Sequence, residues 1–95
     1  MEVRINETLM TMFRQSPCVV CGKRPCHISL ILPIESGGST EYFNLMPLCV
    51  KHCHEHNARQ TIELSNKYIN VKRYVISKGW EFGKTLSHRD LKGSL

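Results

Sequence analysis

No long hydrophobic run occurs in this sequence. Its longest apolar stretch, residues 28–34, is interrupted by Ser29 and Pro33 and is too short to cross a bilayer. The first fifteen residues mix polar and apolar side chains and lack the continuous apolar segment of a signal peptide. Internal repeats and low-complexity segments are also missing. We therefore expect a cytoplasmic protein with no membrane partner.

A complete disulfide framework is disfavoured by the cysteine count. There are five cysteines, and an odd number cannot pair fully within one chain. In a reducing compartment the thiols would stay available to bind metal. A chain of 95 residues buries only a modest core, and a structural metal ion is a common supplement in domains of this size.

Acidic residues are scarce in the C-terminal part of the chain. Residues 1–58 contain equal numbers of acidic and basic side chains, so the net charge of +5 originates entirely from residues 59–95. Such an excess suits an anionic partner, most simply nucleic acid, although a solvated surface that keeps the protein soluble is the alternative. The candidate nucleic-acid-binding residues are Arg59, Lys67, Lys72, Arg73 and Lys78.

Metal-ligand residue types are concentrated between residues 49 and 56. This segment contains two cysteines and three histidines, and a Cys-x2-Cys pair lies upstream at Cys18 and Cys21. Cysteine and histidine are the ligands that zinc prefers. The spacing predicts a structural zinc bound by Cys18, Cys21 and Cys49, with either His52 or Cys53 as the fourth ligand.

Helices and strands are predicted in an order typical of a small α+β domain. Periodic apolar residues and capping signals favour helices at residues 6–15, 50–67 and 70–78. Two extended segments around the Gly37-Gly38 loop, at residues 27–33 and 43–48, predict a hairpin. The domain is expected to span residues 1–82, and residues 83–95 form a polar C-terminal tail.

Several single residues have ordinary interpretations. We expect Ala58 and Ile62 to face inward from the long helix, and His54 and His56 to be solvated on it. His88 is expected at the surface. Aromatic residues near the end of the domain, Tyr74, Trp80 and Phe82, are expected to pack rather than to stack on bases.

Five motifs in this order resemble the HNH nuclease family, and more narrowly the small, often phage-encoded HNH proteins with a zinc knuckle. Together they cover roughly residues 14–82. The matching segments are Pro17-Cys18-Val19-Val20-Cys21-Gly22, His27-Ile28, Ser36-Gly37-Gly38-Ser39, Asn44-Leu45-Met46-Pro47-Leu48-Cys49 and Lys78-Gly79-Trp80-Glu81-Phe82. The resemblance implies a zinc knuckle joined to a ββα-metal core with flanking helices.

The resemblance also implies a function and a role for each matching residue. It implies a metal-dependent endonuclease acting on DNA phosphodiester bonds, located in the host cytoplasm if the protein is phage-encoded. His27 would be the general base, and Asn44 would hold the hairpin and orient that base. The structural zinc would be bound by Cys18, Cys21, Cys49 and His52. A second divalent metal, Mg, Mn, Ni or Zn, would be bound by Cys26, Cys53 and Asn57.

Two of these positions depart from the family pattern. The family usually has Asp or His where Cys26 stands and His where Cys53 stands, and thiolates favour zinc over harder catalytic cations. The alternative function is a catalytically degenerate HNH-fold module that binds nucleic acid or a protein, such as a phage inhibitor of a host factor. In an alternative register Cys53 completes the knuckle, and His52 and His56 hold the catalytic metal.

Overall fold

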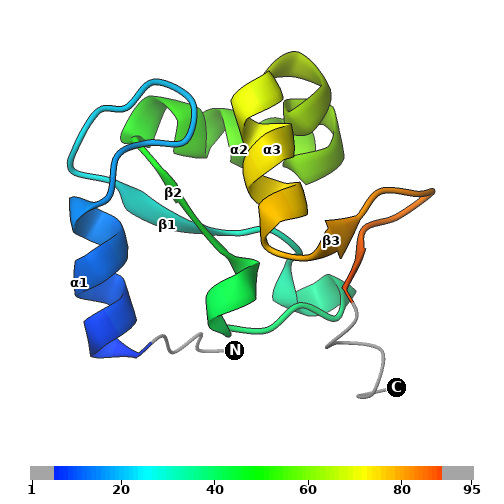
Figure 1. The fold of residues 1–95 in the computed structure, drawn as a ribbon, viewed down its shortest axis with the longest axis horizontal. Coiled ribbons are helices and arrows are strands. Elements are labelled where there is room, and N and C mark those ends of the chain that lie inside the picture. The colour runs from blue at the N-terminus through cyan, green and yellow to red at the C-terminus, as the bar shows by residue number, and fades with distance from the viewer. Residues whose placement is uncertain (1–5, 89–95) are drawn as a thin grey trace.

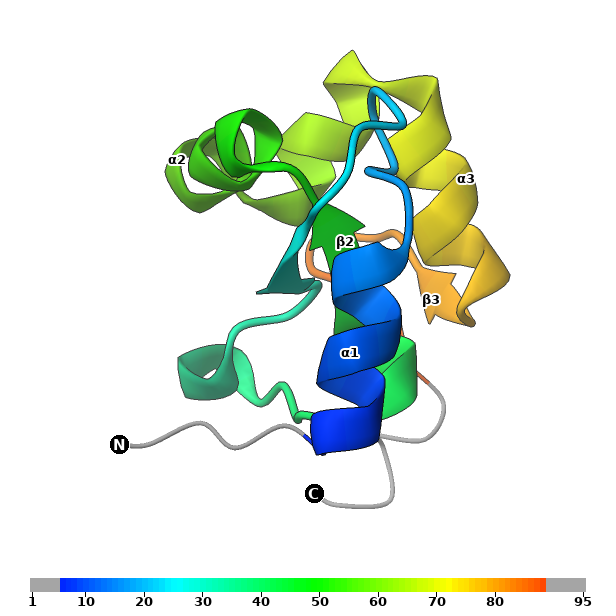
Figure 2. The ribbon, with the colours of Figure 1, turned by 90° about the vertical axis from the view of Figure 1, so that its left-hand side faces the viewer.

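A two-stranded antiparallel sheet lies at the centre of the computed structural model, which describes residues 6–88 (Figure 1). Strands β1 (His27–Leu30) and β2 (Leu45–Leu48) pair in the register that sets His27 opposite Leu48 and Leu30 opposite Leu45. Helix α1 (Glu7–Gln15) packs on this hairpin from one side, and α2 (Val50–Lys67) packs on it from another (Figure 2). The domain therefore belongs to the α+β class, as the sequence predicts.

Helix α1 begins and ends at its sequence signals. The side-chain oxygen of Asn6 accepts hydrogen bonds from the backbone N–H groups of Thr8 and Leu9, at 2.8 and 3.3 Å. This cap satisfies two of the donors that a helix start leaves unpaired. Phe13 is the buried residue of the helix, and Ser16 ends it in an extended conformation. The predicted N-terminal helix is confirmed.

The hairpin strands are shorter than the predicted extended segments. Two short 3₁₀ helices, Ile34–Ser36 and Tyr42–Asn44, occupy residues that the sequence assigns to the connecting loop and to the second strand. Gly38 lies so close to Leu32 that a Cβ atom would overlap the Leu32 carbonyl group. The connection is therefore a packed segment that returns to β1, and only glycine fits at that point.

Helix α2 has the predicted bounds, but it is broken at Gln60. This residue has φ 69° and ψ 171°, a conformation that is almost confined to glycine. The buried side of α2 includes His52, His56 and Thr61 as well as Leu64. The predicted inward residue Ala58 is exposed, and Ile62 is only half-buried. The prediction that Ala58 faces inward is wrong because polar side chains with specific hydrogen-bond partners occupy the inward face of α2.

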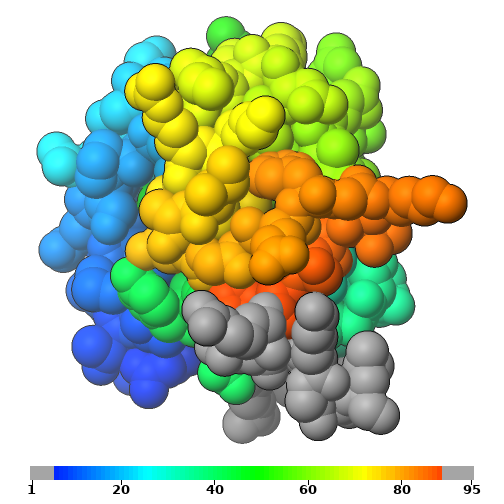
Figure 3. Space-filling view, turned by 45° about the vertical axis from the view of Figure 1, so that its right-hand side comes forward, coloured from blue at the N-terminus to red at the C-terminus, as the bar shows by residue number. Residues whose placement is uncertain are grey.

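After the third helix, which the sequence predicts, the C-terminal region contains a hairpin that the sequence did not predict. Helix α3 (Ile69–Ser77) is followed by β3 (Trp80–Glu81), which pairs with β4 (Ser87–His88). The β3–β4 hairpin projects beside α3 (Figure 3). The predicted polar tail therefore does not begin at residue 83, because Leu86 is buried, and its remainder, residues 89–95, lies outside the described residues.

His88 is buried, so its expected position at the surface is wrong. Its ring stacks on Phe43 with centroids 4.0 Å apart, and its Nε2 lies 2.7 Å from the Lys78 carbonyl oxygen. Trp80 packs as predicted, since it is buried and its indole N–H donates to the Phe43 carbonyl group at 2.8 Å. Strands of two residues are too short to show an alternating pattern, so no periodicity in the sequence signals this packing.

The core joins the hairpin to the second half of α2 and to α3. Its fully buried apolar side chains come from all of these elements: Ile31, Leu45, Met46, Leu48, Leu64, Val71 and Val75. Among residues 6–88, no helix has the length and apolar character needed to cross a membrane.

Candidate metal centre

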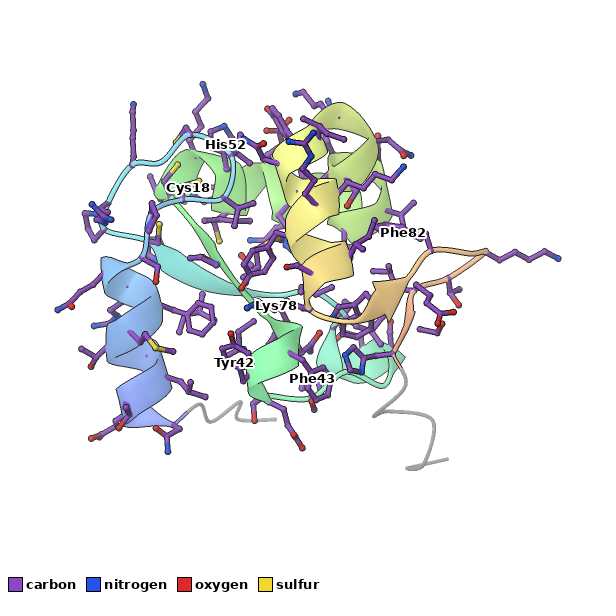
Figure 4. All side chains as sticks on the ribbon, viewed as in Figure 1. Cys18, Tyr42, Phe43, His52, Lys78 and Phe82 are labelled. Carbon is purple, nitrogen blue, oxygen red and sulfur yellow. The ribbon has the colours of Figure 1, made fainter. Side chains whose placement is uncertain are left out.

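Four side chains with metal-binding atoms converge at the start of α2. The ligand atoms of Cys18, Cys21, Cys49 and His52 all lie within 4.8 Å of one another. The Cys49 sulfur is 3.2 Å from Nδ1 of His52, and the Cys18 sulfur is 3.7 Å from the same atom. Figure 4 shows Cys18 and His52 near each other beside the first turn of α2. These four residues could bind a metal ion such as zinc.

Two of the ligand distances agree with tetrahedral zinc, and the Cys49–His52 distance of 3.2 Å is slightly shorter. Zn–S bonds of about 2.3 Å and Zn–N bonds of about 2.0 Å place neighbouring ligand atoms of a tetrahedron roughly 3.5–3.8 Å apart. The sulfurs of Cys21 and Cys49 are 3.7 Å apart, and the Cys18–His52 distance is also 3.7 Å. The side chains are thus already close to the arrangement that a zinc ion requires.

Local backbone contacts bring the two halves of the centre together. The loop before β1 turns at Gly22, which has φ 77° and donates its N–H to the Cys18 carbonyl oxygen at 2.9 Å. The N–H of Val19 donates to the carbonyl oxygen of Pro47 in β2, at 3.0 Å. Cys49 is the N-cap of α2, and His52 follows it by one helical turn. The sequence therefore positions two ligands by a tight turn and two by a helix start.

The centre favours a thiolate at Cys18. Burial opposes ionisation of this thiol, but hydrogen bonds from the backbone N–H groups of Cys49, Cys21 and Val20 outweigh it and lower the pKa of Cys18 to about 6. At Cys21, which is exposed, a hydrogen bond from the Lys23 backbone favours the thiolate, but desolvation and the neighbouring thiols of Cys49 and Cys18 outweigh it and raise the pKa. A bound cation would reverse the effect of the neighbouring thiols, since it attracts all three thiolates.

Cys53 is not part of this group of four. Its sulfur accepts a hydrogen bond from the Ser29 hydroxyl group at 3.4 Å, which holds it against β1. His52 is directed toward Cys18 and Cys49. The alternative register requires His52 to pair with His56 instead, and the two do not pair. Of the two sequence registers, the structure assembles the one with His52.

The residues of the implied second metal site do not converge. Cys53 and Asn57 line a cleft of about 780 Å³ between β1 and α2, here named the hairpin cleft, together with Ser29 and His56. Cys26 does not line it: its thiol donates to the carbonyl oxygen of Lys23, which follows the candidate ligand Cys21 by two residues, at 3.3 Å. Burial, followed by the charges of the knuckle thiolates, raises the pKa of Cys26 to about 11. Cys26 therefore lies apart from Cys53 and Asn57, and the implied ligand set is not assembled.

His56 is buried, so its expected position as a solvated helix residue is wrong, while His54 is exposed as expected. Nε2 of His56 lies 2.7 Å from the hydroxyl oxygen of Thr61, and that hydroxyl group donates to the Ile31 carbonyl oxygen at 2.5 Å. The hydroxyl proton is thereby used, so Nε2 carries the proton that Thr61 accepts. Burial lowers the pKa of His56, which favours the neutral form of the ring. No sequence motif marks this contact between α2 and Ile31, the residue that follows β1.

Asn44 and His27 differ sharply in their surroundings. Asn44 is completely buried, and its amide makes three hydrogen bonds: it accepts from the Leu32 N–H at 2.8 Å and donates to the carbonyl oxygens of Leu32 and Ser39 at 2.9 and 2.6 Å. His27 is exposed at the start of β1, and its side chain makes no hydrogen bond within residues 6–88. It shares a strand face with Ser29, which contacts α2 through Cys53.

No family model, curated protein or solved structure matches this chain. Its function is therefore inferred from the arrangement of its own residues.

Three of the five predicted nucleic-acid-binding residues already have partners within the domain. Arg59 contacts Glu63 and Glu55 at 3.0 and 3.5 Å, and Lys67 also pairs with Glu55. Lys78 donates to the Tyr42 hydroxyl group at 2.6 Å and lies 4.4 Å from the centroid of that ring (Figure 4).

Lys72 and Arg73 remain available. Both are exposed on α3, and neither side chain makes a hydrogen bond or ion pair within the described part of the chain. The charge excess of the C-terminal sequence is thus only partly available to an anionic partner.

Proposed function

We propose that this protein is an HNH-type, metal-dependent endonuclease that hydrolyses DNA phosphodiester bonds on a scaffold held by structural zinc. The antiparallel hairpin followed directly by α2 supports this proposal, because it is a ββα arrangement with a metal-binding group at its junction. One observation carries it furthest. Asn44 is locked in the interior by three hydrogen bonds, whereas the His27 ring is exposed and has no partner among residues 6–88.

The proposed role of His27 is that of general base. A ring nitrogen that no protein group occupies can accept a proton from a water molecule as the water oxygen attacks phosphorus in line. The bond from phosphorus to the leaving sugar oxygen then breaks, and that oxygen takes up a proton from solvent. His27 begins a strand that is hydrogen-bonded to β2, so the hairpin fixes its backbone.

Asn44 has a positioning role in this proposal. Its side-chain amide hydrogen-bonds to the backbone of Leu32 and of Ser39, on both sides of the connecting segment. The backbone carbonyl oxygen of Asn44 also accepts a hydrogen bond from the Ile31 N–H at 2.8 Å. These bonds tie the far end of β1 to the chain that enters β2. The strand that bears His27 is therefore held from its C-terminal end.

A catalytic cation would polarise a phosphate oxygen and stabilise the charge that develops on the leaving oxygen. Among the residues that the resemblance implies, Cys53 and Asn57 share the hairpin cleft and could contribute to holding it, whereas Cys26 lies with the knuckle. This separation specifically favours a second candidate function, in which the same scaffold binds nucleic acid or a protein without cleaving it.

A plasmid-nicking assay with Mg²⁺, Mn²⁺, Ni²⁺ and Zn²⁺ distinguishes the two functions. We expect nicking by the wild type and a loss of about 10²- to 10⁴-fold in rate for His27→Ala, because this is the usual contribution of a general base. Zinc content and DNA affinity should stay near wild type in that variant. His54→Ala is the matched control, since His54 is also exposed and lies on α2. Wild-type protein that binds DNA but nicks it with none of the metals would leave the binding module as the function.

A further inference from the structure

A second cleft lies beside the zinc ligands and is lined by cations. The knuckle cleft, as we name it, has a volume of about 430 Å³ and is formed by the segment from Cys21 to His27 and the first turn of α2. Lys23, Arg24 and His27 line it from the segment, and Lys51 lines it from the helix. It is separate from the hairpin cleft, which none of these four residues lines.

The cations of the knuckle cleft are not neutralised by carboxylates. Lys23 and Lys51 are exposed and make no ion pair within residues 6–88. Arg24 donates its Nε–H to the Gln15 carbonyl oxygen at 2.7 Å, which orients the guanidinium group, and its terminal nitrogens have no partner within residues 6–88. This contrasts with Arg59 and Lys67, which share Glu55.

The zinc centre does not cancel this positive charge. Among residues 6–88 no Asp or Glu lines the cleft, and the negative charges that these residues bring to its wall come from the candidate zinc ligands. Three thiolates exceed the double positive charge of a zinc ion by one unit, whereas Lys23, Arg24 and Lys51 supply three positive charges. The cleft therefore remains positive by two units when zinc is bound.

The start of α2 adds to the attraction for anions. Its first turn contains no acidic residue, and the side chain of its N-cap residue, Cys49, makes no capping hydrogen bond. Free backbone N–H groups and the positive end of the helix dipole favour anionic groups, phosphates above all. Three unpaired cations converge on the knuckle cleft and can surround a phosphate. Of Lys72 and Arg73 on α3, only Arg73 lines a cleft, and the second cation there, Lys78, already donates to Tyr42.

We propose that the knuckle cleft is the main phosphate-binding site of this protein and that Lys23, Arg24 and Lys51 contact a backbone phosphate of DNA there. The choice of DNA as the source of the phosphate rests on the proposed function. The site places the phosphate in the cleft that His27 also lines, and all of its residues precede the predicted basic segment, residues 59–95. Zinc binding and phosphate binding are then linked, because Cys21 and Cys49 form part of the same wall.

Salt-dependent DNA binding tests the location of the site. The full chain with zinc would be titrated with a short DNA duplex over a range of salt concentrations, as wild type, as Lys23→Gln with Lys51→Gln, and as Lys72→Gln with Arg73→Gln. The two double variants remove the same charge. We expect the first to weaken binding and to lower the log–log salt slope by about 0.9 for each phosphate that the variant no longer neutralises, and the second to change both much less. Zinc content and circular dichroism confirm that each variant is folded.

The opposite ranking would overturn the inference. If the Lys72/Arg73 variant loses affinity and the Lys23/Lys51 variant binds like the wild type, DNA lies on α3, and the proposed function still stands. A titration with inorganic phosphate provides a readout that needs no DNA. The backbone amide signals of Val50 and Lys51 should shift in the wild type and not in the Lys23/Lys51 variant. Absence of that shift refutes the site, whereas the shift without any DNA binding retains the site and refutes the nuclease.

Discussion

Replacing Asn44 by alanine tests whether its buried amide holds the hairpin together. The substitution removes three hydrogen bonds of 2.6–2.9 Å and leaves the N–H and carbonyl groups of Leu32 and the carbonyl group of Ser39 without this partner. A buried polar group that loses its partner costs about 1–3 kcal/mol. The three bonds act on one loop, which can relax and admit water, so the losses will not add fully. We expect a decrease of about 3 kcal/mol in the free energy of unfolding.

The change is large relative to the stability of a small domain, which is about 5–15 kcal/mol. Equilibrium unfolding in urea, monitored by circular dichroism with zinc held in excess, would measure this decrease in the free energy of unfolding. Asn66→Ala is the matched control, because Asn66 is an exposed asparagine on α2 and its loss should change stability by less than about 0.5 kcal/mol. Asn44→Asp should also destabilise the domain, since a carboxylate cannot donate to the two carbonyl groups.

A loss of less than about 1 kcal/mol for Asn44→Ala would refute the reasoning. It would mean that water replaces the amide at little cost, and that the connecting segment does not depend on Asn44. The positioning role proposed for Asn44 would then fail as well, because it relies on the same three bonds. A large loss in stability with full nicking activity per folded molecule would separate the structural role from the catalytic one.

Two further predictions concern the metal centre and the kink of α2. Cys18→Ser should abolish zinc binding and leave the chain unfolded or molten, because zinc contributes on the order of 10 kcal/mol to the folding of small modules. The control variant Cys26→Ala should still bind zinc. Elemental analysis measures the zinc content of both variants, and circular dichroism measures their folding. Gln60→Gly should raise the free energy of unfolding by about 1 kcal/mol, since glycine adopts φ 69° and ψ 171° without strain, and a decrease in thermal melting would contradict this.

The ligands of the metal centre could be predicted from sequence because their spacing is local. Two cysteines separated by two residues face each other across a tight turn, and Cys49 and His52 are one helical turn apart. The choice between His52 and Cys53 is different, because both follow Cys49 closely enough. The choice depends on how α2 packs against β1, because the Ser29 hydroxyl group in β1 donates a hydrogen bond to the Cys53 sulfur.

The fold class, the three helices and the central hairpin also follow from local patterns: the Asn6 cap, the periodic apolar residues and the Gly37-Gly38 loop. The short strands β3 and β4 do not, because two residues carry no periodicity and their stability comes from Trp80 and His88 packing on Phe43.

The distribution of charge shows most clearly what the sequence determines and what depends on the tertiary structure. By itself the sequence determined that the excess of basic residues lies after residue 58, since counting requires no coordinates. Only the tertiary structure decided which cations are available, because ion pairs form between side chains that the fold brings within reach. Lys67 pairs with Glu55, which lies 12 residues earlier, whereas Lys23 and Lys51, in the balanced half of the sequence, lie together in a cleft that no carboxylate of residues 6–88 lines. Coulomb interactions depend on distance in space, and sequence position predicts that distance only within a turn of helix or a tight loop.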